Sequence, residues 1–127
     1  MSDVLSKIPI KIKVEGVGEV EGELVRIYAP LTVDRLLRRL PIDGRAHPIN
    51  GGVSIIINIK RGEEKSVKKV EAGTISYWPR GDAICLYYVP VYTQSPVNRI
   101  GKIKNNLDHI INIKSGTPIR IYRINSV

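Results

Sequence analysis

Residues 77–88 read Tyr77-Trp78-Pro79-Arg80-Gly81-Asp82-Ala83-Ile84-Cys85-Leu86-Tyr87-Tyr88 and contain the only Trp, the only Cys and three of the six Tyr of this 127-residue chain. Pro79 supplies the φ that a tight turn needs at its second position, and Gly81 can adopt a positive φ, so the chain should reverse at 79–82. Residues 83–89 form an apolar run of strand length. The stretch predicts a β-hairpin whose second strand is buried on both faces, with Cys85 as a small core residue.

Patterns on both sides of this hairpin predict further antiparallel strands. Asn50-Gly51 is a strong signal for a two-residue hairpin turn between two of them. The alternation of apolar and polar residues marks the others. The expected strands lie at 8–14, 19–28, 43–49, 53–59, 97–103 and 118–124, with a short irregular strand at 67–70 inside a charged loop and a polar loop at 90–95.

Two segments have helical spacing instead. In residues 32–40 the apolar side chains fall three and four positions apart, with Thr32 as the N-cap and Pro41 as the end. Residues 105–113 show similar spacing before Ser115-Gly116. The whole pattern amounts to eight strands and two short helices without an internal repeat.

Length and composition indicate a single domain over residues 1–127, large enough to fold without disulfides. One Cys permits no internal disulfide, and the N-terminus lacks the pattern of a signal peptide. No apolar run is long enough to span a bilayer. We therefore expect a cytoplasmic protein that does not enter membranes, and the abundance of Ile and Lys is typical of a thermophilic source.

A formal net charge of +8 raises the possibility of nucleic-acid binding. The basic residues are scattered among acids, however, and no known recognition module is present, so a well-solvated basic surface is the favoured interpretation. His47 and His109 lack companions at metal-ligand spacing. No phosphate loop, carboxylate pair or catalytic triad can be assembled, so we expect no metal and no cofactor.

Two blocks of residues resemble a known family. Gly73-Thr74-Ile75-Ser76 and Ile100-Gly101-Lys102-Ile103 are similar to segments of cyclophilins. The pattern over residues 77–88, followed by Asn98 and the Gly-Lys segment, resembles more closely a family of small, uncharacterised prokaryotic cyclophilin-like proteins. The resemblance implies a mainly β fold: a closed eight-stranded antiparallel barrel with two short capping helices. Because side chains fill a barrel of this size, a ligand would bind on its outer face.

The resemblance also implies candidate site residues. Cyclophilins bind a Pro-containing peptide in an outer groove where an Arg polarises the amide, and Arg45 is the catalytic candidate here. The Phe-His-Arg and Phe-Met-Gln-Gly-Gly-Asp motifs of cyclophilins are absent. The candidate ligand-binding residues are Tyr77, Trp78, Tyr88 and Asn98. Trp78 fits either an exposed aromatic wall or a plug at the barrel mouth, and Asn98 either a ligand contact or a bond within the wall.

The favoured function is a binding domain for a peptide or small ligand on the outer barrel face, as a monomer or homodimer and without established catalysis. A diverged peptidyl-prolyl cis-trans isomerase and a basic nucleic-acid-binding barrel are the alternatives.

Overall fold

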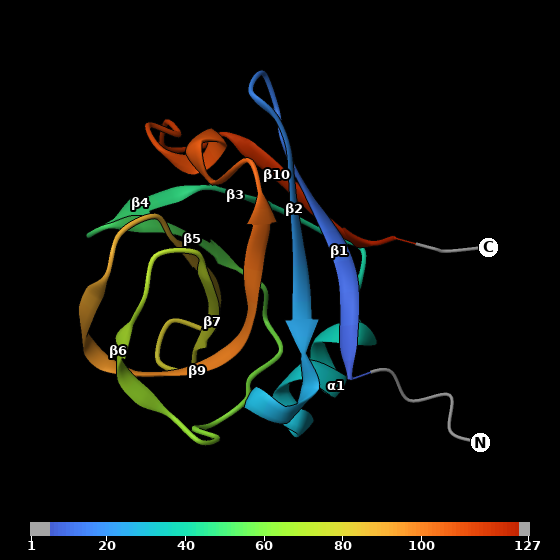
Figure 1. The fold of residues 1–127 in the computed structure, drawn as a ribbon, viewed down its shortest axis with the longest axis vertical. Helices are drawn as coiled ribbons and strands as arrows, with labels where there is room; N and C mark the ends of the chain where they lie inside the picture. Colours follow the sequence, from blue (N-terminus) through green and yellow to red (C-terminus); the bar gives the residue numbers. More distant parts are fainter. Residues whose placement is uncertain (1–5, 125–127) are drawn as a thin grey trace.

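The computed structural model describes residues 6–124 as a single antiparallel sheet of ten strands with one α-helix (Figure 1). The predicted domain, 1–127, includes residues 1–5 and 125–127, which lie outside the described part. The strands are β1 (Lys7–Val14), β2 (Gly18–Val25), β3 (Ile42–Arg45), β4 (His47–Ile49), β5 (Gly52–Ile56), β6 (Val67–Val70), β7 (Thr74–Trp78), β8 (Ala83–Tyr87), β9 (Val91–Asn105) and β10 (Pro118–Arg123). The helical segments are α1 (Pro30–Leu37) and the 3-10 turns η1 (Arg26–Tyr28) and η2 (Leu107–Ile110).

The sheet curls strongly, but its hydrogen-bonded ladder is not closed. Its strand order is β3-β10-β1-β2-β9-β7-β8-β5-β4, with β6 paired to β9 outside this path. Although β3 and β4 are consecutive in the chain, β3 pairs only with β10 and meets β5 by packing: the Ile55 side chain lies against Gly44, where a Cβ would come within 2.5 Å of Ile55 Cγ2. The predicted mainly β, antiparallel fold is confirmed. The closed eight-stranded barrel is not, because side-chain packing replaces backbone pairing at this seam.

The long strand β9 connects two parts of the sheet. Its first half pairs with β6, for example Val91 with Val70, and its second half pairs with β7 and β2. In Figure 1 it curves around one side of the molecule before rising beside β2. The predicted loop at 90–95 is wrong for all but Pro90, because residues 91–95 belong to β9. Pro96 interrupts the alternation near the point where the partner changes from β6 to β7.

Apolar side chains cover both faces of the central hairpin. The main core lies on the inner face and includes Ile10 and Ile12 of β1, which are at most 1% exposed. A second cluster lies on the opposite face of β8 and joins Cys85 and Tyr87 to Val70, Val91 and Val97. Every residue of β8 is buried, which confirms the prediction of a strand covered on both faces.

The helical segments are shorter than predicted. The helix α1 begins at Pro30, two residues before the expected Thr32. In place of a helix at 105–113 the chain forms only the turn η2, because Asn106 and Asn112 adopt left-handed φ values of 66° and 68° that interrupt a right-handed helix. The second predicted capping helix is therefore not confirmed.

Candidate ligand-binding site

A pocket of about 580 Å³ opens on the outer face of the central hairpin, where β6 and the first half of β9 lie over β8. Its volume is within the range of small-molecule sites. The lining consists of Ile49 at the end of β4 and Asn50 in the turn after it, Trp78 and Arg80 from the end of β7 and the turn after it, Cys85 and Tyr87 from β8, and residues 91–95 and 97 from β9.

Trp78 forms a fixed wall of this pocket. Its indole Nε1 donates a hydrogen bond of 2.7 Å to Ser95 Oγ on β9. Gly81, in the turn after β7, lies against the opposite part of the ring, where a Cβ would overlap Trp78 Cε3. Gly81 is thus required for space, and the left-handed residue of the turn is Asp82, with φ 53°. The half-buried indole is therefore held from both sides.

The floor of the pocket is uncharged. Cys85 and Tyr87 point outward from β8, opposite to Ile84 and Leu86, because side chains alternate along a strand. Burial raises the pKa of the Cys85 thiol to about 11, which the neighbouring polar groups of Tyr87 and Ser76 only partly offset. Burial likewise raises the pKa of Tyr87. At neutral pH both groups are protonated, so Cys85 does not have the thiolate character of a nucleophile.

The rim of the pocket is polar. Arg80 is exposed in the turn after β7, and Tyr92 on β9 is 76% exposed. Outside the lining, Lys69 Nζ lies 5.5 Å from the centre of the Tyr92 ring and 3.8 Å from Glu71 Oε2. The rim therefore combines an aromatic ring with basic side chains, above an apolar and uncharged floor.

Two of the predicted site residues hold the loop between β5 and β6 instead of lining the pocket. Tyr77 is completely buried in the main core, where its hydroxyl donates to Asp82 Oδ1 at 2.6 Å and accepts from the Arg61 amide at 3.1 Å. Asn98 is also completely buried, with its Oδ1 accepting from the Glu64 amide and its Nδ2 donating to Gly62 O. These hydrogen bonds fit the interpretation of Asn98 as a residue that bonds within the protein, and not as a ligand contact.

Tyr88 and Arg45 also lie away from this lining. Tyr88 is half-buried against the main core. Arg45 is exposed on β3, and its guanidinium donates to Gly116 O at 2.9 Å. Of the five predicted residues, the structure brings only Trp78 to the pocket.

Most of the other lining residues are not predicted as site residues, because their sequence patterns indicate core, turn or loop. A signal for two of them exists in the sequence: strict alternation along residues 83–87 places Cys85 and Tyr87 on the same face, opposite to the main core. No comparable signal exists for Ser95. Its contact with Trp78 depends on the path of β9.

A second pocket, of about 370 Å³, lies between α1 and β10 and is lined by Leu37, Leu40, Pro41, Arg120, Tyr122 and Arg123. Its polar groups are largely used within the protein. Arg120 Nη1 contacts both carboxylate oxygens of Asp43, at 2.9 and 2.8 Å. Because this pocket is smaller and its Arg120 is already paired with Asp43, we place the candidate site at Trp78.

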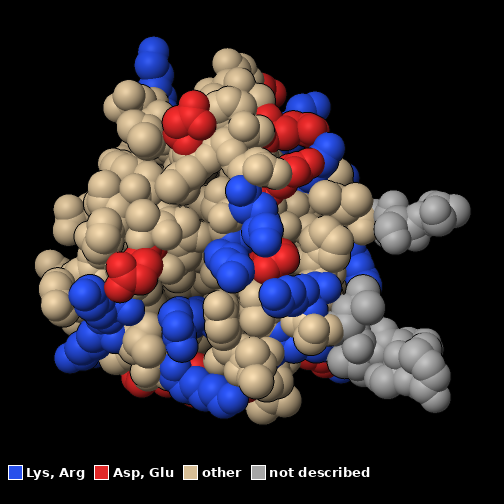
Figure 2. All heavy atoms as spheres, viewed as in Figure 1, with Lys and Arg blue, Asp and Glu red and all other residues tan. Residues whose placement is uncertain are grey.

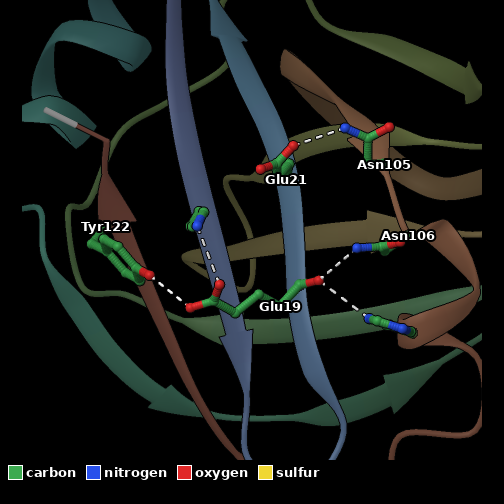
Figure 3. Close-up of polar contacts among 7 residues, drawn as sticks. Glu19, Glu21, Asn105, Asn106 and Tyr122 are labelled. Carbon is green, nitrogen blue, oxygen red and sulfur yellow. Dashed lines mark hydrogen bonds and ion pairs between the residues drawn. The ribbon is translucent and has the colours of Figure 1, made fainter. Parts of the chain in front are cut away.

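A polar cluster around Glu19 joins β1, β2 and β10 on the outer surface (Figure 3). Glu19 accepts a hydrogen bond of 2.9 Å from the Tyr122 hydroxyl and lies 3.2 Å from Lys11 Nζ. These contacts lower the pKa of Glu19, and they raise the pKa of Tyr122 and of Lys11. Each group therefore keeps its usual charge at neutral pH. The cluster links strands and does not provide an acid–base pair.

Neither a cluster of metal ligands nor a membrane-spanning helix is found in the described part of the chain. Residues 6–124 contain no group of three or more His, Cys, Asp or Glu side chains arranged to hold a metal ion. Over the same residues, no helix is long and apolar enough to cross a membrane.

Comparison with known proteins identifies the family. A family model described as cyclophilin-like matches residues 8–122, so the chain belongs to the cyclophilin-like family, and the resemblance found in the sequence is confirmed. The solution structure of the hypothetical protein AF2241 from Archaeoglobus fulgidus is similar, with a TM-score of 0.81 and 28% sequence identity over 98% of this chain and 100% of that chain. A comparison with curated proteins finds no match.

A larger protein shares the fold. The structure of McbB in complex with tryptophan has a TM-score of 0.77 and 16% sequence identity, and the match covers 93% of this chain but 45% of McbB. The chain therefore spans less than half the length of McbB, and at this identity the likeness concerns the fold alone.

Proposed function

We propose that this protein is a ligand-binding domain that takes a small molecule, or a short Pro-containing peptide, into the pocket beside Trp78. The observation that carries the proposal is the fixed indole wall over an uncharged floor, in a pocket of about 580 Å³. Aromatic side chains that are already held in place lose little entropy on binding, and pockets of this kind are typical small-molecule sites.

Burial of a ligand against this wall would be driven mainly by removal of apolar surface from water. Trp78 and Tyr92 supply accessible aromatic surface and Ile49 supplies aliphatic surface, above a floor of nearly buried apolar side chains. Because McbB was solved in complex with tryptophan, indole compounds are reasonable first probes. The ligand of McbB supports this choice of probe only.

The test is an NMR titration of the isotope-labelled full chain with a fragment panel and a panel of Xaa-Pro peptides. We expect saturable shifts of the Trp78 indole N–H and of amides along residues 91–97. The Trp78→Ala variant should lose this binding, while Trp78→Phe, which keeps an aromatic wall but lacks the bond to Ser95, should bind weakly. Shifts that cluster around the smaller pocket at Tyr122, or no saturable shifts at all, would contradict the proposal.

The same peptide spectra report cis–trans exchange. Exchange that is accelerated by the protein and slowed by Arg45→Ala would support a diverged isomerase instead of a binding domain. We do not favour that function, because Arg45 contacts Gly116 O and lines neither of the two pockets.

A further inference from the structure

The lining of the pocket beside Trp78 carries a positive charge but no negative charge. Among its lining residues, Arg80 is the only one with a formal charge at neutral pH, and none is Asp or Glu. Within residues 6–124, Arg80 forms no ion pair. The nearby Lys69 is matched by Glu71 at 3.8 Å. A positive charge therefore remains uncompensated at the rim.

The interior of the pocket favours apolar, uncharged groups. The half-buried Trp78 offers aromatic surface, and Tyr87, Val91 and Val97, each at most 8% exposed, close the apolar floor beneath it. The polar atoms of the floor are protonated and neutral, since the pKa of Cys85 is raised to about 11 and that of Tyr87 is also raised. Burying a charged group against this floor would be costly, because no opposite charge is available there. A charge on the ligand is tolerated only at the rim.

We propose that the ligand of this pocket is a small organic anion, in which a flat aromatic body lies against Trp78 and a single carboxylate is bound by Arg80. This inference rests on the proposed function and deepens it. The planar guanidinium of Arg matches a carboxylate with two parallel N–H donors. One Arg neutralises one negative charge, so a monoanion fits better than a phosphate dianion. The absence of Asp and Glu from the lining disfavours ligands that carry an ammonium group.

Four compounds that share the indole ring test this preference for a monoanion, the charge rule, on the 127-residue protein: indole, indole-3-acetate, tryptamine and tryptophan. They present the same ring with no charge, a negative charge, a positive charge and both charges. We expect indole-3-acetate to bind about tenfold more tightly than indole, as is typical of a charge-assisted hydrogen bond that is partly exposed. Tryptamine should bind most weakly, and tryptophan should fall below indole-3-acetate. Raising the salt concentration should reduce the preference for the anion.

The decisive variant is Arg80→Gln, which keeps polarity and removes the charge. It should remove most of the preference for the anion, so that the Kd of indole-3-acetate becomes similar to that of indole. Arg35→Gln is the matched control, because Arg35 is an exposed residue on α1 outside this pocket. Spectra of both variants report whether the fold is intact.

The outcomes separate the two proposals. If indole and indole-3-acetate bind equally well, or if Arg80→Gln leaves the preference intact, the charge rule is overturned while the pocket remains a binding site. If tryptamine binds best, the rule is also overturned. If none of the four compounds shifts the Trp78 indole N–H, the inference fails, and the proposed function then depends on the fragment and peptide panels.

Discussion

The Trp78 side chain both contributes to the packing of the fold and lines the candidate site. Its ring contacts Gly81 within its own turn and Ser95 on a strand that arrives later in the chain. The first contact is local, and the second joins residues seventeen positions apart. Because the protein contains only one Trp, its fluorescence reports the state of the pocket directly.

Substitution of Gly81 by Ala should disturb this arrangement. The added Cβ would overlap the Trp78 ring, so the ring or the turn must move. We expect a loss of about 1–3 kcal/mol in the free energy of unfolding, as for other overpacked sites, together with a change in Trp fluorescence. Urea unfolding followed by fluorescence measures both.

Gly62→Ala is the control for this prediction. Nothing lies within 4 Å of a Cβ at Gly62, and its φ is not in the left-handed region. Its free energy of unfolding should stay within about 0.5 kcal/mol of the parent protein, as for most surface substitutions. Equal stability of the two variants, with unchanged Trp fluorescence, would contradict the prediction that a Cβ at position 81 disturbs Trp78.

At the scale of elements, the segment between β5 and β6 is held by carboxylates and not by a ladder of strands. Glu64 accepts hydrogen bonds from the amides of Leu31 and Thr32 at the start of α1, at 2.9 and 2.8 Å. Asp82 Oδ1 accepts from the amides of Ile59 and Lys60, both at 3.0 Å. Two loops and the helix are thereby joined through anions that accept backbone N–H groups.

These contacts predict acid sensitivity. Burial alone would raise the pKa of Glu64 and of Asp82, but the hydrogen bonds outweigh it, and each pKa lies below its ordinary value of 4.5 or 3.8. A carboxyl group with a lowered pKa in the folded state stabilises the fold above its unfolded pKa, and this contribution is lost as the pH falls through the folded pKa. We therefore expect the free energy of unfolding to decrease below about pH 4.5.

Urea unfolding between pH 3 and pH 7 measures this effect. In Glu64→Gln the free energy of unfolding should be lower at neutral pH and should change less on acidification, because one of the titrating groups is absent. Glu15→Gln, in the exposed turn between β1 and β2, should keep the parent profile. A parent-like slope in Glu64→Gln would show that Glu64 does not contribute to the acid response.

At the scale of the whole molecule, positive charge is abundant but interrupted. Figure 2 shows Lys and Arg side chains along the lower half of one face, with Asp and Glu among them. Several basic residues are also paired, such as Arg120 with Asp43 and Arg38 with Asp34. The net charge of +8 therefore predicts weak, nonspecific attraction to polyanions.

A nucleic-acid column tests this expectation. Binding that depends on scattered charges should be lost steeply as salt increases, because it depends on the release of counterions. We expect retention on immobilised DNA or RNA at low ionic strength and elution below about 0.15 M salt. Retention above that concentration, or preference for one sequence, would indicate a specific nucleic-acid surface and favour that alternative function.

The local pattern of the sequence determined much of the secondary structure and the family. Features that depend on neighbours within a few residues can be predicted from the sequence alone. They include the turn at 79–82, the Asn50-Gly51 hairpin and the alternation of β1. The aromatic residues near the turn also pointed to Trp78. The helix predicted at 105–113 failed because two left-handed Asn residues decide its ends, and apolar spacing carries no information about them.

Only the tertiary structure decided which other residues join Trp78 at the candidate site. Whether Tyr77 or Cys85 meets the pocket depends on which face of the hairpin is covered by the core and which by β9. The Trp78–Ser95 and Asn98–Glu64 contacts join segments that are distant in the sequence. Alternation along a strand divides side chains between two faces, but it does not specify what each face meets. That choice arises from the path of β9 over the outer face, and the pocket exists because of it.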